Sequence, residues 1–244
     1  LATGSISFEK KTDTMYSYMF NHDKKRTLYT DWHMNGAGTT DMSGSSDAEC
    51  IEFIVKPDKS YSDQTILKLS GSEGESMWDL RIIPEGSSNV QSRLEFRLNH
   101  TTESYVGHVG TVSSSLQSPA LNFKTNEFWN VMLYRTSESY NTDLDGITGH
   151  PEASHSLIWN NMTASYHMLV GRNTGDKIRD LYAVSMSVTN PNANHAWACT
   201  GSHAVGGRTV AGNLVVGETL TGSLAELRLW KAPLSMSRFK QHIL

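Results

Sequence analysis

Apolar and polar residues alternate along much of the chain with a period of two. In one segment Trp78, Leu80 and Ile82 are separated by Asp79 and Arg81. Because successive side chains of a strand point to opposite faces of a sheet, this pattern is typical of a strand with one buried face. Segments of this kind predict strands over residues 49–57, 76–83, 94–98, 127–134, 181–188 and 223–230.

Turn-forming residues separate these segments and favour an all-β fold. Runs rich in Gly, Ser and Pro occupy residues 70–74, 84–88 and 201–207, and such runs mark loops. Strands do not alternate with helical segments, as they would in a doubly wound parallel sheet. The pattern therefore predicts an all-β fold, either a sandwich or a barrel. The stretch 116–126 is interpreted as a loop that leads into the strand at Phe128.

A short helix is predicted at the C-terminal end. Ser235 or Ser237 is placed to cap it, because a serine hydroxyl accepts a hydrogen bond from the first free N–H groups of a helix. Phe239 and Ile243 follow one helical turn apart and share one side of the helix. We expect that side to pack on the sandwich.

The last thirty residues resemble a known family. A turn at Gly222 leads into a strand that ends in Arg228-Leu229-Trp230, and Leu234-Ser235 then begins a helix. This order is similar to the closing motif of laminin-G-like (LamG) domains, a branch of the concanavalin A-like lectin and glucanase superfamily. Segments that resemble other strands of the family are 49–57, 126–134 and 214–217. The resemblance covers roughly residues 40–244 and implies an antiparallel two-sheet β-sandwich of the jelly-roll type. Because all-β sandwiches commonly use about 200 to 250 residues in one domain, we expect a single laminin-G-like domain over residues 1–244.

The first forty residues lie outside this resemblance. They are rich in aromatic side chains, namely Tyr16, Tyr18, Phe20, Tyr29 and Trp32. Two interpretations of this N-terminal arm, residues 1–40, stay open. It supplies an edge strand of the sandwich, or it docks on a neighbouring chain, because sheet edges and bulky aromatic groups both favour pairing with a partner.

The charge of the chain and the spacing of its two cysteines limit which partners and which cysteine chemistry we expect. The chain has 21 Lys and Arg against 25 Asp and Glu, a formal charge of −4, without the basic stripe that binds phosphates. We therefore expect no nucleic-acid partner. No apolar window approaches the roughly 18 residues of a membrane span, so no membrane insertion is expected. Cys50 and Cys199 are too far apart for a CxxC motif, which leaves a disulfide or two free thiols as alternatives.

The sequence lacks the carboxylate pattern of the superfamily's glucanases, Glu-apolar-Asp-apolar-apolar-Glu on one strand. Glu73, Glu75 and Asp79 come nearest, but the first two lie in a Gly/Ser turn, whereas retaining hydrolysis needs two carboxyl groups held about 5 Å apart. A Gly-x-Ser-x-Gly elbow and an His-Glu-x-x-His metal motif are also missing. We therefore expect that the protein is not an enzyme.

One candidate calcium site lies in the segment Asp143-Leu144-Asp145-Gly146. Asp143 and Asp145 offer two hard carboxylates before a glycine that allows a tight bend, as calcium loops require. The family resemblance also implies calcium at the rim of the sandwich. The alternative is an Asp/Gly hairpin turn held by hydrogen bonds from side chains to backbone.

Candidate glycan-binding residues lie in loop-like segments. Trp159, Trp197 and Tyr140 have aromatic faces on which a sugar ring stacks, and Asn160 and Asn194 beside them offer amide groups. The alternative for each Trp is packing within the core or a loop, because an indole buries a large area.

Taken together, these features predict a non-enzymatic binding or structural module. The resemblance implies that such a module is displayed outside a cell or on a virus particle, where it mediates assembly or adhesion. Its partners would be other protein subunits of an assembly or surface glycans. Two alternatives stay open, a carbohydrate-binding lectin module and a glycan-active hydrolase with carboxylates on loops.

Overall fold

The computed structural model describes residues 2–3, 7–10, 16–20, 27–31, 50–58, 62–70, 76–88, 90–98, 114–139, 163–188, 213–230 and 232–244. Its strands are β1 (Ala2–Thr3), β2 (Ser7–Lys10), β3 (Tyr16–Phe20), β4 (Thr27–Asp31), β5 (Cys50–Pro57), β6 (Gln64–Ser70), β7 (Ser76–Pro84), β8 (Ser92–Leu98), β9 (Ser114–Gln117), β10 (Trp129–Ser139), β11 (Thr163–Thr174), β12 (Lys177–Val188), β13 (Asn213–Val216) and β14 (Gly222–Trp230). One helix, α3 (Met236–Ile243), follows the last strand.

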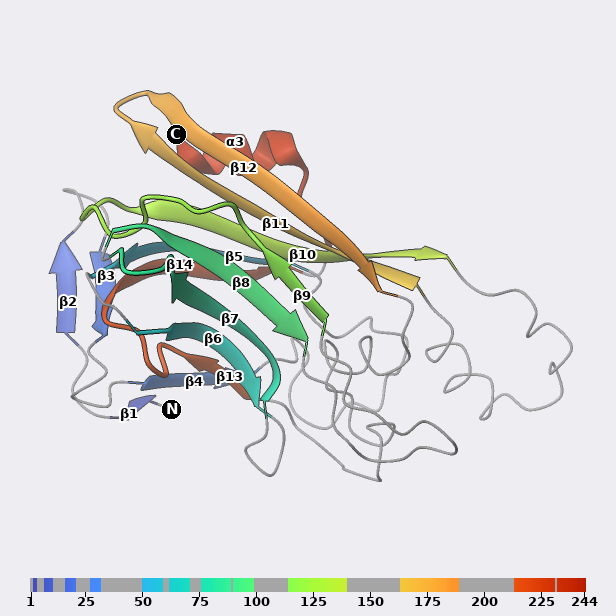
Figure 1. Cartoon of the computed structure of the whole chain (residues 1–244), viewed down its shortest axis with the longest axis horizontal. Helices are drawn as coiled ribbons and strands as arrows, with labels where there is room; N and C mark the ends of the chain where they lie inside the picture. Colours follow the sequence, from blue (N-terminus) through green and yellow to red (C-terminus); the bar gives the residue numbers. More distant parts are fainter. Residues whose placement is uncertain are drawn as a thin grey trace, which may run out of the picture.

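The strands form two layers (Figure 1). Sheet A has the order β1-β4-β13-β6-β7-β8-β9, and sheet B has the order β12-β11-β10-β5-β14-β3-β2. Every described strand pair is antiparallel. The prediction of an all-β, antiparallel two-sheet sandwich with a short C-terminal helix is therefore confirmed.

The inner faces of the two sheets meet in one large apolar core. Trp78 and Phe96 of sheet A lie against each other with ring centroids 5.8 Å apart, and Phe96 meets Tyr166 of sheet B at 5.6 Å. All three side chains are fully buried. Tilted ring pairs of this kind add to the free energy gained from burial of the aromatic surface. The alternation seen in the sequence therefore positions the core, and the intervening residues face outward.

The six predicted strands all form, with small shifts at their ends. β12 begins at Lys177 instead of 181, and β10 runs on to Ser139. The interpretation of 116–126 as a loop is wrong at its start, because β9 covers Ser114–Gln117. This strand has four residues and buries only Leu116 inward, so it is too short for alternation to be visible.

Gly222 and a β-bulge set the course of β14. The φ of Gly222 is 146°, and a Cβ atom there would lie 2.3 Å from the carbonyl oxygen of Lys56, so a glycine is needed for the close approach of β14 to β5. Further along, Glu226 has a φ of 52° and the register with β5 shifts between Ala225 and Arg228. The extra residue of a bulge reverses the alternation that follows it. Leu227 and Leu229 thus both pack against the core.

The N-terminal strands pair with both sheets. β3 pairs with β14 in sheet B, and β4 pairs with β13 in sheet A. β2 and β1 are then the terminal strands of their sheets. These parts of the N-terminal arm contribute strands to the sandwich, and docking of the arm on another chain stays a prediction.

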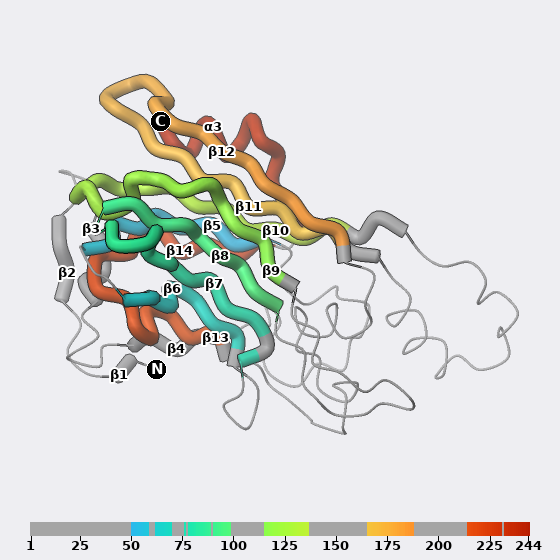
Figure 2. Tube along the Cα trace, viewed as in Figure 1, coloured from blue at the N-terminus to red at the C-terminus, as the bar shows by residue number. Residues whose placement is uncertain are grey.

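Helix α3 covers part of the outer face of sheet B. Ser235 is its N-cap and accepts a hydrogen bond from the backbone N–H of Arg238. Phe239 and Ile243 are buried, as predicted, in a second apolar cluster with Cys50, Met132 and Leu169. Figure 2 shows the helix beside β11 and β12. No helix of the described residues is long and apolar enough to cross a membrane.

Candidate functional site

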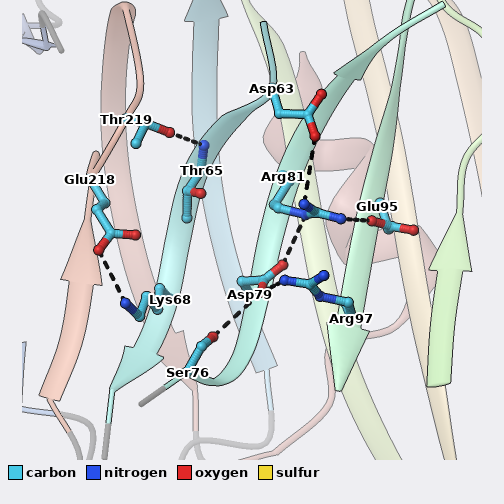
Figure 3. A network of polar contacts seen from close by, with 10 residues as sticks. All are labelled: Asp63, Thr65, Lys68, Ser76, Asp79, Arg81, Glu95, Arg97, Glu218 and Thr219. Carbon is cyan, nitrogen blue, oxygen red and sulfur yellow. Dashed lines mark hydrogen bonds and ion pairs between the residues drawn. The ribbon is translucent and has the colours of Figure 1, made fainter. Parts of the chain in front are cut away.

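The outer face of sheet A carries a two-row grid of charged and polar side chains. They alternate along β6, β7, β8 and β9 with the buried side chains of the core, so they point away from it. Figure 3 shows those on β6, β7 and β8. We call this set the polar array. It consists of Lys68, Asp79, Arg81, Glu95, Arg97 and Gln117.

The strand register brings opposite charges together. In one row Lys68 lies opposite Asp79, and Asp79 lies opposite Arg97. In the next row Arg81 lies opposite Glu95, and Glu95 lies opposite Gln117. Directly opposed side chains have Cβ atoms about 5 Å apart. On β7 and β8 the charge sign therefore alternates both along each strand and between the two strands.

Arg81 joins the two carboxylates of the array. Its Nε atom lies 3.1 Å from Oδ1 of Asp79, and its Nη2 atom pairs with Glu95. Asp79 also accepts a hydrogen bond from Nη2 of Arg97 at 2.7 Å, and Glu95 accepts one from Nε2 of Gln117 at 2.8 Å. Asp79 thus has a hydrogen bond from Arg97 and an ion pair with Arg81, and Glu95 has hydrogen bonds from Arg81 and Gln117.

These contacts keep the array charged. The side chains of Asp79 and Glu95 are only 5% and 9% exposed. Burial alone would raise the pKa of Glu95, but hydrogen bonds from Gln117 and Arg81 outweigh it, and the pKa lies below its ordinary value of 4.5. Glu95 is therefore a carboxylate at neutral pH and is not suited to donate a proton.

Two exposed carboxylates lie at the rim of the array. Glu218, which follows β13, pairs with Nζ of Lys68 at 3.1 Å, and Asp63, which precedes β6, lies 3.6 Å from Nη1 of Arg81. Their side chains are 39% and 55% exposed. Thr219 fixes this rim, because its hydroxyl accepts a hydrogen bond from the backbone N–H of Thr65 at 2.6 Å.

Two arginines on the outer face of β8 differ in how many of their N–H donors form hydrogen bonds within the protein. Arg93 makes a two-point contact with Glu85, at 2.5 Å through Nε and 3.1 Å through Nη2. Arg97 makes a single hydrogen bond, through Nη2 to Asp79. Among the described residues, the buried Nε of Arg97 has no acceptor. Since a guanidinium has five N–H donors, Arg97 retains more donor capacity than Arg93.

A second polar cluster lies beneath helix α3 on sheet B. Nδ1 of His242 lies 2.7 Å from Oε1 of Glu52, and Nη1 of Arg228 lies 3.4 Å from Oε2 of the same carboxylate. The ring of His242 also stacks on Trp230. These contacts join the helix to β5 and β14, so we interpret the cluster as a device that holds the helix in place.

Cys50 belongs to the same side of sheet B. It is a free, buried thiol. Burial raises the pKa of this thiol to about 12, although a hydrogen bond from the backbone of Leu234 opposes the shift. A thiol of this kind stays protonated and unreactive at neutral pH.

The site residues predicted from the sequence lie outside the described residues. These are the aromatic and amide candidates Tyr140, Trp159, Asn160, Asn194 and Trp197, and the calcium candidates Asp143 and Asp145. Within the described ranges, no group of three or more His, Cys, Asp or Glu side chains could hold a metal ion. Of the three carboxylates that come nearest to the glucanase pattern, Asp79 is paired with Arg81 and Arg97. Glu73 and Glu75 lie outside the described residues.

The polar array itself was not predicted. Its signal is present in the sequence, where Asp79 and Arg81 on one strand and Glu95 and Arg97 on the next share the polar face. Alternation shows that these side chains are outward. It does not show which of them are opposite each other, because that depends on strand order and register.

No protein-family model matches the chain, and no curated protein sequence does so either. Among solved structures, the chain is similar to a native heptameric SAP-like pentraxin from Limulus polyphemus, with 11% identity, a TM-score of 0.42, and coverage of 98% of this chain and 81% of that one. It is also similar to an alginate lyase from Pseudomonas aeruginosa, with 10% identity, a TM-score of 0.42, and coverage of 92% and 86%. Both likenesses are too distant to carry a function to this chain.

Proposed function

We propose that this chain is a non-enzymatic binding module that holds glycans on the outer face of sheet A. The observation that carries this proposal is the polar array. Its carboxylates are paired with donor groups of the protein itself, and the cationic groups of Lys68, Arg81 and Arg97 are partly exposed. Glycans are recognised largely by hydrogen bonds to their oxygen atoms, and planar arginine groups make such bonds in pairs.

The state of the carboxylates argues against hydrolysis at the array. Glycoside hydrolysis uses one carboxyl group as a proton donor and a second as nucleophile or base. The pKa of Glu95 is lowered, and Asp79 is paired with two guanidinium groups. With its lowered pKa, Glu95 is not suited to supply a proton at neutral pH, which favours binding over hydrolysis at the array.

We assign the module to a setting outside the cell or on a virus particle, in assembly or adhesion. This rests on the resemblance of residues 222–235 to the closing motif of laminin-G-like domains. The terminal strand β12 of sheet B supports an assembly role, because an edge strand offers backbone groups for pairing with another chain. Calcium at Asp143 and Asp145 belongs to the same proposal and would be tested by a chelator-dependent fall in melting temperature.

The test is a titration of the purified chain with a panel of neutral and anionic glycans. We expect saturable binding that the double variant Arg81→Gln/Arg97→Gln loses, while Arg93→Gln, an arginine of the same face outside the array, keeps it. A chain that binds no glycan would contradict the proposal.

The enzymatic alternative needs its own measurement. The same panel would be assayed for cleavage by the release of new sugar ends. Turnover that Glu95→Gln or Asp79→Asn abolishes would replace the binding function with catalysis.

A further inference from the structure

We infer that two copies of this chain pair through strand β12, so that their B sheets join into one continuous antiparallel sheet around a twofold axis. This inference rests on the assembly role in the proposed function and names the partner of that edge. It does not depend on glycan binding, which the proposed function places on sheet A.

Strand β12 is much longer than the other terminal strands. In the part of the chain that the structure describes, the two sheets end at β1, β9, β2 and β12, which have 2, 4, 4 and 12 residues. Figure 1 shows β12 along one edge of sheet B. A short terminal strand protects a sheet from pairing with other chains, because it offers few free backbone N–H and C=O groups. The length of β12 gives no such protection.

Most of β12 also lacks the charges and irregularities that protect sheet edges. Both features lie at its start, where residues 177–180 carry charges and the register with β11 shifts between Arg172 and Asn173. Residues 181–188 include no charged residue, Pro or Gly, and their register with β11 is continuous. We call residues 181–188 the neutral edge. Its backbone is suited to form a regular ladder with one more strand.

The inner face of the neutral edge carries apolar side chains that the molecule covers only in part. Tyr182, Val184 and Met186 pack against the main core but are half-buried. Strand β9 of sheet A contacts β12 and has only 4 residues. A further strand beside β12 would extend sheet B and cover these side chains. Removal of their apolar surface from water favours association.

The neutral edge is complementary to a second copy of itself. In an antiparallel pair around a twofold axis, one residue lies opposite its own copy, and directly opposed residues share a face. With Ser185 on the axis, Val184 lies opposite the partner's Met186, and Ala183 lies opposite the partner's Ser187. The inner pair is apolar and the outer pair is small. No like charges meet along the ladder, although each chain has a net charge of −4.

The charged residues at the start of β12 select this register. With Ser185 on the axis, Asp180 would lie opposite position 190, which is beyond the end of β12 at Val188. The charges of residues 177–180 then stay outside the ladder. An axis at Val184 or at any earlier residue would bring Asp180 opposite a residue of the partner's β12, and an axis after Ser185 would shorten the ladder. The register at Ser185 is therefore the longest one that excludes these charges.

The oligomeric state of the purified chain tests this inference. Pairing of one strand buries less surface than the roughly 1,600 Å² of a standard interface, so we expect a dimer with a dissociation constant on the order of 10 µM. Sedimentation equilibrium over a series of protein concentrations measures this constant.

A charge on the axis should weaken the dimer. Ser185 is exposed, and in Ser185→Lys the two new ammonium groups would lie opposite each other, so the dissociation constant should rise by at least about fivefold. The matched control is Ser115→Lys, which adds the same charge at an exposed serine of β9, the terminal strand of sheet A. It should change the dissociation constant by less than about twofold. Circular dichroism checks that both variants fold.

Cross-linking tests the register. In Ser185→Cys the two Cα atoms would lie about 4.5 to 5.5 Å apart, within the range of a disulfide. In Ser187→Cys each new thiol would lie opposite position 183 of the partner, and the two would be about 13 Å apart along the strands, too far for a disulfide. Both variants also carry Cys199→Ala, whereas Cys50 is buried and stays. Oxidised glutathione should therefore link Ser185→Cys, and not Ser187→Cys, into a covalent dimer.

The outcomes separate this inference from the proposed function. A chain that stays monomeric would overturn the inference, and so would a dimer that Ser185→Lys leaves unchanged, because that dimer uses another surface. Cross-linking of Ser187→Cys in place of Ser185→Cys would overturn the symmetric register. Glycan binding is measured separately: a monomer that binds glycans retains the glycan-binding function, and a dimer that binds none retains the inference alone.

Discussion

The outer faces of the two sheets differ in how their side chains are covered and paired. Sheet B buries Cys50, Met132 and Leu169 beneath helix α3, whereas the outer face of sheet A has a grid of ion pairs. Apolar burial stabilises by about 25 cal/mol per Å², while exposed ion pairs contribute about 1 kcal/mol or less each. The comparison indicates that the outer face of sheet B contributes more to stability, and we propose that the outer face of sheet A serves binding.

The largest effect is expected from removal of the main apolar side chain of the helix. Phe239→Ala should lower the free energy of unfolding by about 3 kcal/mol, because a fully buried phenylalanine leaves a cavity when truncated. Urea unfolding measures this change. As a control, Met236→Ala on the exposed side of the helix should change the stability by less than about 0.5 kcal/mol. Equal effects of the two variants would show that the helix does not pack as described.

The stability of the protein at high pH tests whether Cys50 is buried on the outer face of sheet B. The folded pKa of the thiol, about 12, lies above its ordinary value of 9.0. Its contribution to stability is therefore fully present below pH 9 and is lost as the pH rises from 9 toward 12. Over that range, wild type should lose up to about 3 kcal/mol more than Cys50→Ala, which has no thiol to titrate. Parallel losses in the two proteins would contradict a buried thiol beneath the helix.

Local patterns in the sequence were enough to predict much of sheet B's outer face. The helix, its cap Ser235 and its two buried residues Phe239 and Ile243 all follow from residues that lie within a few positions of each other. The contact of His242 with Glu52 could not be predicted in this way, because 190 positions separate the two residues. The bulge at Glu226 also escaped prediction, since a non-glycine residue with positive φ has no clear sequence signal.

The polar array shows a second limit of prediction from the sequence. Alternation identifies Asp79, Arg81, Glu95 and Arg97 as outward residues, so the polarity of the face was predictable. Their pairing depends on the register between β7 and β8, and Asp79 meets Arg97 across 18 positions. The aromatic and acidic loop residues that the sequence favours as site residues stay predictions. Strand β11 was also overlooked, although Tyr166, Met168 and Val170 alternate in it.

The smallest expected effect concerns the stability that the array itself provides. The lowered pKa of Glu95 means that the carboxylate is favoured in the folded state. Its contribution to stability is therefore present above the ordinary pKa of 4.5 and is lost as the pH falls through the lower pKa of the folded protein. At pH 7 we expect Glu95→Gln to destabilise by less than about 1 kcal/mol, because the amide oxygen of Gln can still accept a hydrogen bond and the partner Arg81 is itself partly exposed.

Unfolding of Glu95→Gln and wild type should be compared at pH 7 and at pH 3. The difference between them should shrink at pH 3, where wild type also loses the charge of Glu95. The matched control is Glu85→Gln, which removes the carboxylate that accepts two hydrogen bonds from Arg93 outside the array. A loss of several kcal/mol in Glu95→Gln at pH 7 would make the array a main support of the fold. In that case the contrast between a stabilising sheet B face and a ligand-binding sheet A face would no longer hold.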